Sequence, residues 1–206
     1  MSVNTFFEHI YCINLDRRPD RWERCQTEFA KFGIEGVERF SATDGQLHTA
    51  APRLARGAYG VLDTHRRILS NAMQNGYSNI LILEDDVAFN DNFNEYFEEI
   101  ESQVPDDWDI LYLGSNIQNW QPRPVTKNIH IAFGVLALHS VGIAGKAYSN
   151  ILRSLDELTP VDVQYARLAM WLKMYNVIPR MTYQQPGWSD IEQMHVDYNW
   201  FLRDEA

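Results

Sequence analysis

Three consecutive carboxylates, Glu84, Asp85 and Asp86, directly follow a run of four aliphatic residues at 80–83. Such a run is typical of a strand buried on both faces of a parallel or mixed sheet, and ligands of these sheets bind just beyond the carboxyl ends of the strands. Adjacent carboxylates repel one another unless a cation or hydrogen-bond donors relieve them, and their oxygens suit Mg²⁺ or Mn²⁺. The pattern fits equally well a helix N-cap at Asp85 or Asp86 that holds no metal.

A pair of arginines, Arg17 and Arg18, follows the first apolar segment at 10–15 and precedes Pro19. Proline is favoured in the first turn of a helix, so the pair is expected between a strand end and a helix N-terminus. Arginines in that position are well placed to bind a diphosphate. The simpler alternative is that both are solvent-exposed and form surface ion pairs.

Three further polar residues have simple structural explanations when each is taken alone. Asp44 precedes Gly45, and the dipeptide is first of all a turn signal. His65 lies near the apolar side of the helix predicted at 57–75, where a histidine is more often a hydrogen-bonded core residue than a ligand. Asp162 follows a proline and is best explained as the cap of a helix.

The segments that must position these residues alternate between strand and helix patterns. Strands are predicted at 10–15, 37–40, 80–83, 109–114, within 129–139, and at 176–183. Helices are predicted from Pro19 to Phe32, at 57–75, around 93–100, at 145–155, and after Pro160 through apolar residues as far as Tyr175. The alternation predicts an α/β fold with a single mixed sheet of about six strands flanked by helices.

Composition limits the possible classes of partner. A chain of 206 residues suits one domain, and its formal net charge of -10 argues against nucleic acid, which is bound by basic surfaces. One nucleotide diphosphate remains compatible if a metal and local arginines offset the charge. Cys12 and Cys25 have neither disulfide nor metal-ligand spacing, which predicts buried thiols in a reducing compartment. The absence of a signal-peptide pattern and of about 18 consecutive apolar residues predicts a cytoplasmic protein without a transmembrane segment.

Four segments in a fixed order carry a family resemblance. They are INLDRRPDR at 13–21, FSATDG at 40–45, GVLDTH at 60–65 and ILEDDV at 82–87, with weaker agreement at 108–114, 160–162 and 189–191. Together they resemble glycosyltransferase family 25, the lipopolysaccharide and collagen β-galactosyltransferase-like group. Val61, Asp63 and Thr64 depart from the family pattern, which has Cys, an apolar residue and Ser at these positions.

The resemblance implies a GT-A type nucleotide-sugar fold across residues 1–206, with a donor half at about 1–114 and an acceptor half at about 115–206. It also implies an inverting, metal-dependent enzyme of lipopolysaccharide or glycan biosynthesis. Such an enzyme moves a hexose, galactose or glucose, from a UDP-sugar to a glycan or glycosylated acceptor. The cofactor would be Mn²⁺ or Mg²⁺.

The resemblance assigns roles to individual residues. Asp86 would bind the metal together with Glu84, while His195 would either complete that site or lie on the surface. Asp162 is the candidate for the base that takes the acceptor proton, and Asp190 is its competitor. The residues expected to bind the donor are Asn14, Asp16, Arg17, Arg18, Asp44, His65, Glu84 and Asp85.

Two alternatives remain open. One is a non-catalytic protein that binds a nucleotide-sugar or a carbohydrate on the same fold. The other is a Mg²⁺-dependent nucleotidyltransferase, against which the sequence shows no glycine-rich phosphate loop of the Walker type.

Overall fold

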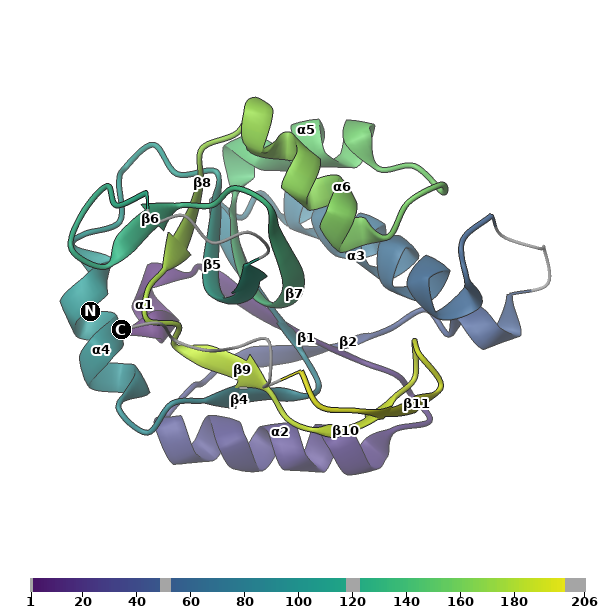
Figure 1. Cartoon of the computed structure of the whole chain (residues 1–206). Helices are drawn as coiled ribbons and strands as arrows, with labels where there is room; N and C mark the ends of the chain where they lie inside the picture. Colours follow the sequence, from purple (N-terminus) through teal and green to yellow (C-terminus); the bar gives the residue numbers. More distant parts are fainter. Residues whose placement is uncertain (1, 49–52, 118–122, 199–206) are drawn as a thin grey trace.

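The computed structural model describes residues 2–48, 53–117 and 123–198, and its centre is a seven-stranded mixed sheet (Figure 1). The strand order is β2-β1-β3-β7-β5-β8-β6. The bounds are β1 His9–Asn14, β2 Val37–Ser41, β3 Asn79–Glu84, β5 Ile110–Ile117, β6 Ile129–Ile131, β7 Val135–Ala144 and β8 Met174–Val177. β1 pairs in parallel with β2 and β3, and β5 with β8, whereas β7 runs antiparallel to both β3 and β5. The predicted mixed α/β fold is confirmed, with seven strands in the main sheet.

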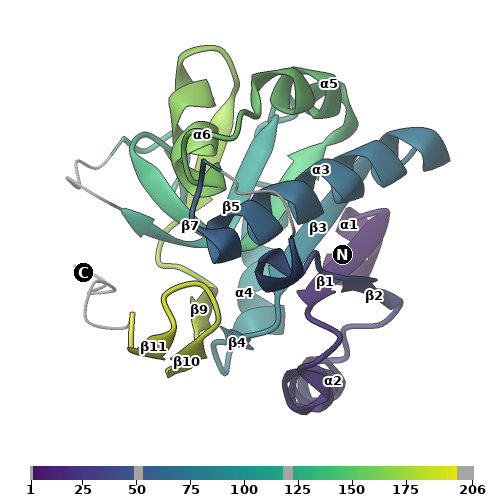
Figure 2. The ribbon, with the colours of Figure 1, turned by 90° about the vertical axis from the view of Figure 1, so that its right-hand side faces the viewer.

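Helices cover both faces of this sheet (Figure 2). Their bounds are α1 Val3–Phe6, α2 Pro19–Phe32, α3 Arg56–Asn75, α4 Phe93–Glu101, α5 Gly145–Ser154 and α6 Val161–Arg167, with short 3-10 turns η1 Gly45–Leu47 and η2 Leu168–Met170. In β3, Ile80 and Ile82 pack with α3, α5 and α6, while Leu81 and Leu83 pack with α1, α2 and α4. This alternation explains the continuous aliphatic run, because both faces of the strand are buried.

Two small sheets lie beside the main one, above α2 in the lower part of Figure 1. β4 Val87–Phe89 pairs with β9 Thr182–Gln184, and β10 Gly187–Ser189 forms a hairpin with β11 Met194–Val196. Because β4 begins one residue after Asp86 and the next helix begins at Phe93, neither Asp85 nor Asp86 caps a helix. The helix-cap explanation of the acidic triplet is therefore wrong.

The helix predicted to run from Pro160 as far as Tyr175 is also corrected. α6 ends at Arg167 and Tyr175 lies in β8, where it pairs with Leu111 of β5. Trp171, assigned by its spacing to the apolar face of this helix, is 77% exposed. Pairing of β8 between β5 and β6 overrides the helical spacing of these apolar residues.

Other local predictions are confirmed. α2 starts at Pro19 and ends at Gly33, while α3 ends at Gly76, and both glycines adopt the left-handed conformation typical of helix ends. Cys12 and Cys25 are buried free thiols. Within the described ranges, every helix is too short or too polar to cross a membrane.

Candidate active site

A central pocket lies at the carboxyl ends of β1 and β3, between the start of α3 and the β10–β11 hairpin. Its polar and charged lining comes from segments far apart in the chain: Asn14, Arg17, Arg21, Thr43, Asp44, Gln46, Thr64, Glu84, Asp85, Asp86, Gln184, Ser189, Asp190 and Tyr198. The acidic triplet therefore lies where the sheet topology predicted a site.

Asp85 is the most buried carboxylate of the triplet, and other residues of the protein donate hydrogen bonds to it. Its side chain accepts hydrogen bonds from Asn14 Nδ2 at 2.7 Å and Arg21 Nη1 at 2.6 Å, and the residue is 8% exposed. Its backbone carbonyl accepts further hydrogen bonds from Arg24 and from the Cys25 thiol. Asp85 therefore links the end of β3 to α2, and both of its carboxylate oxygens already accept hydrogen bonds from the protein.

Glu84 and Asp86 face the pocket and share one side-chain amide. Gln184 Nε2 lies 3.3 Å from Glu84 Oε2 and 3.4 and 3.5 Å from the two carboxylate oxygens of Asp86. Burial and then the neighbouring carboxylates raise the pKa of Glu84 well above its usual range, and burial and Asp85 raise the pKa of Asp86 to about 6. Two poorly compensated carboxylates favour binding of a cation between or beside them.

The residues present fit a divalent metal that is only partly enclosed by protein. Mg²⁺ and similar ions are commonly held by one or two carboxylates together with water and substrate phosphates, and Glu84 and Asp86 supply two such groups. Among the described residues, no three His, Cys, Asp or Glu side chains are grouped so as to hold a metal. The expected set of Glu84, Asp86 and His195 is therefore not assembled. His195 lies on β11 against the ring of Trp188, at 5.6 Å between centroids.

The two arginines of the opening motif bind carboxylates of the protein. Arg17 donates from Nε to Asp44 and from Nη1 to Asp190, both at 2.7 Å, and Arg18 Nη1 donates to the second oxygen of Asp190 at 2.6 Å. The two ion pairs with Asp190, which join residues 172 and 173 positions apart in sequence, hold the β10–β11 hairpin over the end of β1. Arg18 also pairs with Asp20.

Asp190 is consequently a weak candidate for the catalytic base. Although burial by itself would raise the pKa of this carboxyl group, the hydrogen bonds from Arg17 and Arg18 lower it below its ordinary value. A carboxylate whose two oxygens accept from two guanidinium groups has little tendency to take a proton from an alcohol. The other predicted base, Asp162, accepts a hydrogen bond from the backbone of Val163 and has no arginine partner among the described contacts.

Two residues expected to bind the donor form hydrogen bonds and ion pairs with other side chains of the protein. Asp16 accepts a hydrogen bond from Ser41 and forms an ion pair with Arg39. Its side chain is 70% exposed and does not line the central pocket. Asn14 lines the pocket, but it is 1% exposed and bonds to Asp85, Arg39 and the carbonyl of Arg18.

His65 is fully buried beside Tyr165 and does not line the central pocket. This is the core position that its place on the apolar face of α3 suggested.

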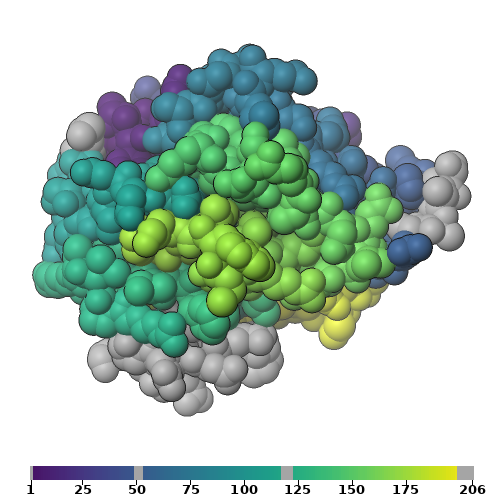
Figure 3. All heavy atoms as spheres, turned by 90° about the horizontal axis from the view of Figure 1, so that it is seen from above, coloured from purple at the N-terminus to yellow at the C-terminus, as the bar shows by residue number. Residues whose placement is uncertain are grey.

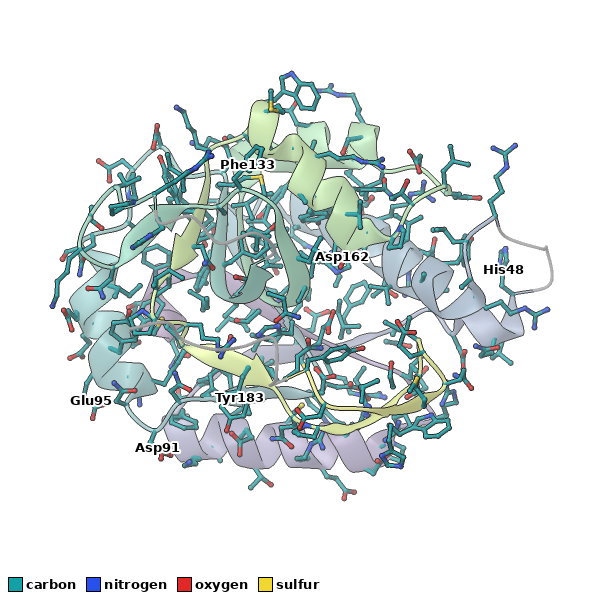
Figure 4. The ribbon with its side chains drawn as sticks, viewed as in Figure 1. His48, Asp91, Glu95, Phe133, Asp162 and Tyr183 are labelled. Carbon is teal, nitrogen blue, oxygen red and sulfur yellow. The ribbon has the colours of Figure 1, made fainter. Side chains whose placement is uncertain are left out.

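A side pocket adjoins the central one and contains Asp162. Figure 4 shows Asp162 at the end of α6 nearer the hairpin. The polar lining is Glu84, Asn116, Asp162, Gln184, Glu192 and Tyr198, and the apolar lining includes Ala58, Val61, Leu136, Leu138, Val161 and Ile191. Glu84, Gln184 and Tyr198 line both pockets, so the two spaces meet at these side chains.

A profile described as glycosyltransferase family 25 (LPS biosynthesis protein) matches residues 7–138 of the chain. The chain belongs to glycosyltransferase family 25. The match covers β1 to the first half of β7, including the acidic triplet and the arginine motif. The family assignment expected from four sequence segments is thus confirmed.

Family 25 relatives include proteins with different assigned activities. The human "Inactive glycosyltransferase 25 family member 3" is 30% identical over 184 residues, covering 76% of this chain and 31% of the relative. A family member of Aedes aegypti is 31% identical over 75% of this chain and 30% of its own length. The "Procollagen lysyl hydroxylase and glycosyltransferase" of Acanthamoeba polyphaga mimivirus is 33% identical over 131 residues, 50% of this chain and 14% of the relative. The chain thus spans about a third or less of these proteins.

Solved glycosyltransferases resemble the fold more distantly. One is involved in glycosylation of the major capsid of PBCV-1, with 11% identity, a TM-score of 0.43, and coverage of 72% of this chain and 66% of that one. Another is a mutant Drosophila galactosyltransferase in complex with manganese, UDP-Gal and xylobiose, with 12% identity, a TM-score of 0.43, and coverage of 96% and 74%. Because both scores lie below 0.5, the family assignment rests on the sequence matches.

Three residues of the candidate site were not among the residues predicted from the sequence. Arg21 ends the opening motif, so its position was available, but only the fold shows that it neutralises Asp85. Gln184 reaches Glu84 and Asp86 because β9 pairs with β4 across almost a hundred residues. Tyr198 lines both pockets from the segment after β11 and carries no local signal of such a role.

Proposed function

We propose that this family 25 chain transfers a hexose, galactose or glucose, from a UDP-sugar to a hydroxyl group of a glycan or glycosylated acceptor, with inversion at the anomeric carbon. The observation that carries the proposal is the junction of two pockets at Glu84, Gln184 and Tyr198. The central pocket, with the family's arginine and acidic motifs, would bind the donor. The side pocket, with Asp162, would bind the acceptor.

Charge supports a metal-dependent reaction. Two arginines and five carboxyl groups line the central pocket, so the site by itself would repel a diphosphate. A divalent cation at Asp86 and Glu84 would reverse this repulsion, and it would supply stabilisation of the negative charge that develops on the leaving diphosphate. Arg17 would approach the donor with the part of its guanidinium group that Asp44 and Asp190 leave unbound.

Inversion needs a single base on the acceptor side of the reacting carbon. Asp162 is proposed for that role because it lines only the side pocket, near the junction, and lacks an arginine partner within the described contacts. Its carboxylate accepts from the backbone N–H of Val163 at 2.8 Å, which leaves the second oxygen for the acceptor hydroxyl. Apolar residues around it would contact the carbon face of a sugar ring.

The proposal is tested by binding and slow hydrolysis of UDP-, GDP- and CMP-sugars, each with Mn²⁺ and with chelator. We expect one UDP-hexose to bind in a metal-dependent manner and Asp86→Asn to lose that binding while remaining folded. The matched control is Asp91→Asn, which changes an exposed carboxylate that pairs only with Lys31 in the described structure. Equal binding of all donors with chelator, or unchanged binding by Asp86→Asn, would contradict the proposal.

A non-catalytic nucleotide-sugar or carbohydrate-binding protein is the second candidate. It is favoured by the names of two mammalian relatives, from Bos taurus and Homo sapiens, which are described as probable inactive and inactive and are 27% and 30% identical to this chain. Saturable donor binding without hydrolysis or transfer across a broad acceptor panel would support this candidate.

A further inference from the structure

The helix that carries Asp162 is short and weakly fixed by its own sequence. α6 has seven residues, begins after Pro160, and has no side-chain hydrogen bond at its N-cap. Isolated helices of this length are unstable, so the orientation of α6 depends on its tertiary contacts. Gln164 fixes one side of the helix to the preceding loop through hydrogen bonds with Asp156 and Thr159.

On another side, Tyr165 fixes α6 to α3. The Tyr165 hydroxyl lies 3.2 Å from His65 Nδ1, and the two rings meet edge to face with centroids 5.6 Å apart. Both residues are completely buried, and α3 lies beside α6 (Figures 2 and 3). Tyr165 follows Asp162 by three positions, so the two side chains share one face of α6. A rotation that moved Tyr165 would therefore also move Asp162.

Burying this polar pair between two helices carries a cost in folding free energy. Burial lowers the pKa of His65 to about 4 and raises the pKa of Tyr165, so both groups are neutral at pH 7. His65 Nε2 has no hydrogen-bond partner among the described residues, although it is buried. An unsatisfied buried polar atom destabilises the folded state, and apolar side chains of similar size would avoid that cost. A specific orientation of the helix is what the hydrogen bond adds.

The charge of Asp162 acts on two buried groups. Tyr112 of β5 is buried, its hydroxyl has no partner among the described residues, and burial and then Asp162 raise its pKa. Asp162 also contributes, after burial and the neighbouring carboxylates, to the raised pKa of Glu84 at the junction of the two pockets. A rotation of α6 would change the distance from Asp162 to both groups.

We propose that His65 and Tyr165 are positioning residues, whose hydrogen bond sets α6 so that the Asp162 carboxylate faces the acceptor hydroxyl. The proposal rests on the proposed transferase function and replaces the expected donor-binding role of His65. Neither residue touches a substrate pocket, so both act through Asp162.

The test is Tyr165→Phe, which removes the hydroxyl and keeps the ring. We expect kcat for transfer to fall between about 10-fold and 100-fold, the effect of misplacing a catalytic group by a fraction of an ångström to 1 Å, with the donor Kd unchanged. The matched control is Tyr148→Phe, a buried tyrosine on α5 whose hydroxyl has no partner among the described residues, and it should leave kcat unchanged. His65→Asn, which keeps a hydrogen-bonding group near the position of Nδ1, should retain more activity than His65→Ala.

Hydrogen exchange of the amides in 161–167 provides a readout that does not need transfer activity. Tyr165→Phe should speed exchange there, and Tyr148→Phe should not. An unchanged kcat, or a donor Kd that weakens as much as kcat falls, would overturn the proposal, as would unchanged exchange in α6. If the wild-type chain transfers no sugar while Tyr165→Phe still speeds exchange in α6, the proposed function fails. The role of the His65–Tyr165 hydrogen bond in fixing α6 to α3 is then retained.

Discussion

Replacement of Arg21 tests whether Asp85 is a structural anchor instead of a donor ligand. Arg21 Nη1 lies 2.6 Å from Asp85, and each side chain of the pair is only 12% exposed. Arg21 Nη2 also donates to the carbonyl of Trp188 at the start of the hairpin. Arg21→Met keeps much of the aliphatic length and removes the charge, so Asp85 would stay buried with only Asn14 as a side-chain donor.

The expected cost follows from this burial. Removing one partner of a buried ion pair costs about 3–5 kcal/mol, because the remaining charge is left without compensation. For a chain of 206 residues, each kcal/mol lowers Tm by roughly 2–4 °C, so Arg21→Met should lower Tm by roughly 6–20 °C. Adding Asp85→Asn should recover part of the loss, because the double variant no longer buries an unpaired carboxylate.

The measurement is urea unfolding of wild type, both single variants and the double variant, with coupling taken from the cycle. The control is Lys31→Met on the same helix, whose partner Asp91 is 97% exposed and whose loss should cost less than about 1 kcal/mol. A loss below about 1 kcal/mol in Arg21→Met, or strictly additive single variants, would refute the structural role of Asp85.

Two further predictions concern Asp190 and His139, a buried residue of β7. Asp190→Asn should retain transfer and bind UDP more tightly in calorimetry, because it removes a negative charge and one carboxylate partner from each of Arg17 and Arg18. A loss of kcat with intact donor binding would restore Asp190 as the base. Burial lowers the pKa of His139 to about 4, so the unfolded chain binds the proton near pH 6.5 and the folded chain only near pH 4. The free energy of unfolding should therefore fall as pH drops through this window. Between pH 7 and pH 4, His139→Gln should lose about 3 kcal/mol less of this free energy than wild type, as measured by urea unfolding. Equal losses would show that His139 is not buried in neutral form.

The position of the candidate site was predictable from the sequence because its main signals are local. A run of aliphatic residues buried on both faces must end at the edge of the sheet, so the triplet after Leu83 had to emerge beside the end of β1. The motif containing Arg17 and Arg18 lies on that neighbouring strand end for the same reason. The helix starts and ends at Pro19, Gly33 and Gly76 were equally local.

The different contacts of Glu84, Asp85 and Asp86 were not predictable, because they depend on long-range pairing. Alternation along β3 directs Asp85 toward α2, where Arg21 neutralises it, while Glu84 and Asp86 face Gln184 of β9. The ion pair between Arg17 and Asp190 depends on a hairpin more than 170 residues away in the sequence. Tertiary pairing of β8 also overrode the helical spacing of residues after Arg167. Contacts of this kind leave no trace in local composition.

The most direct test of the account is transfer of labelled hexose from a UDP-sugar to a panel of glycan acceptors, followed in wild type, Asp86→Asn and Asp162→Asn. We predict metal-dependent transfer by wild type, loss of donor binding and transfer in Asp86→Asn, and loss of transfer with donor binding retained in Asp162→Asn. Transfer by Asp162→Asn at the wild-type rate, or donor binding by wild type without transfer to any acceptor, would contradict the account.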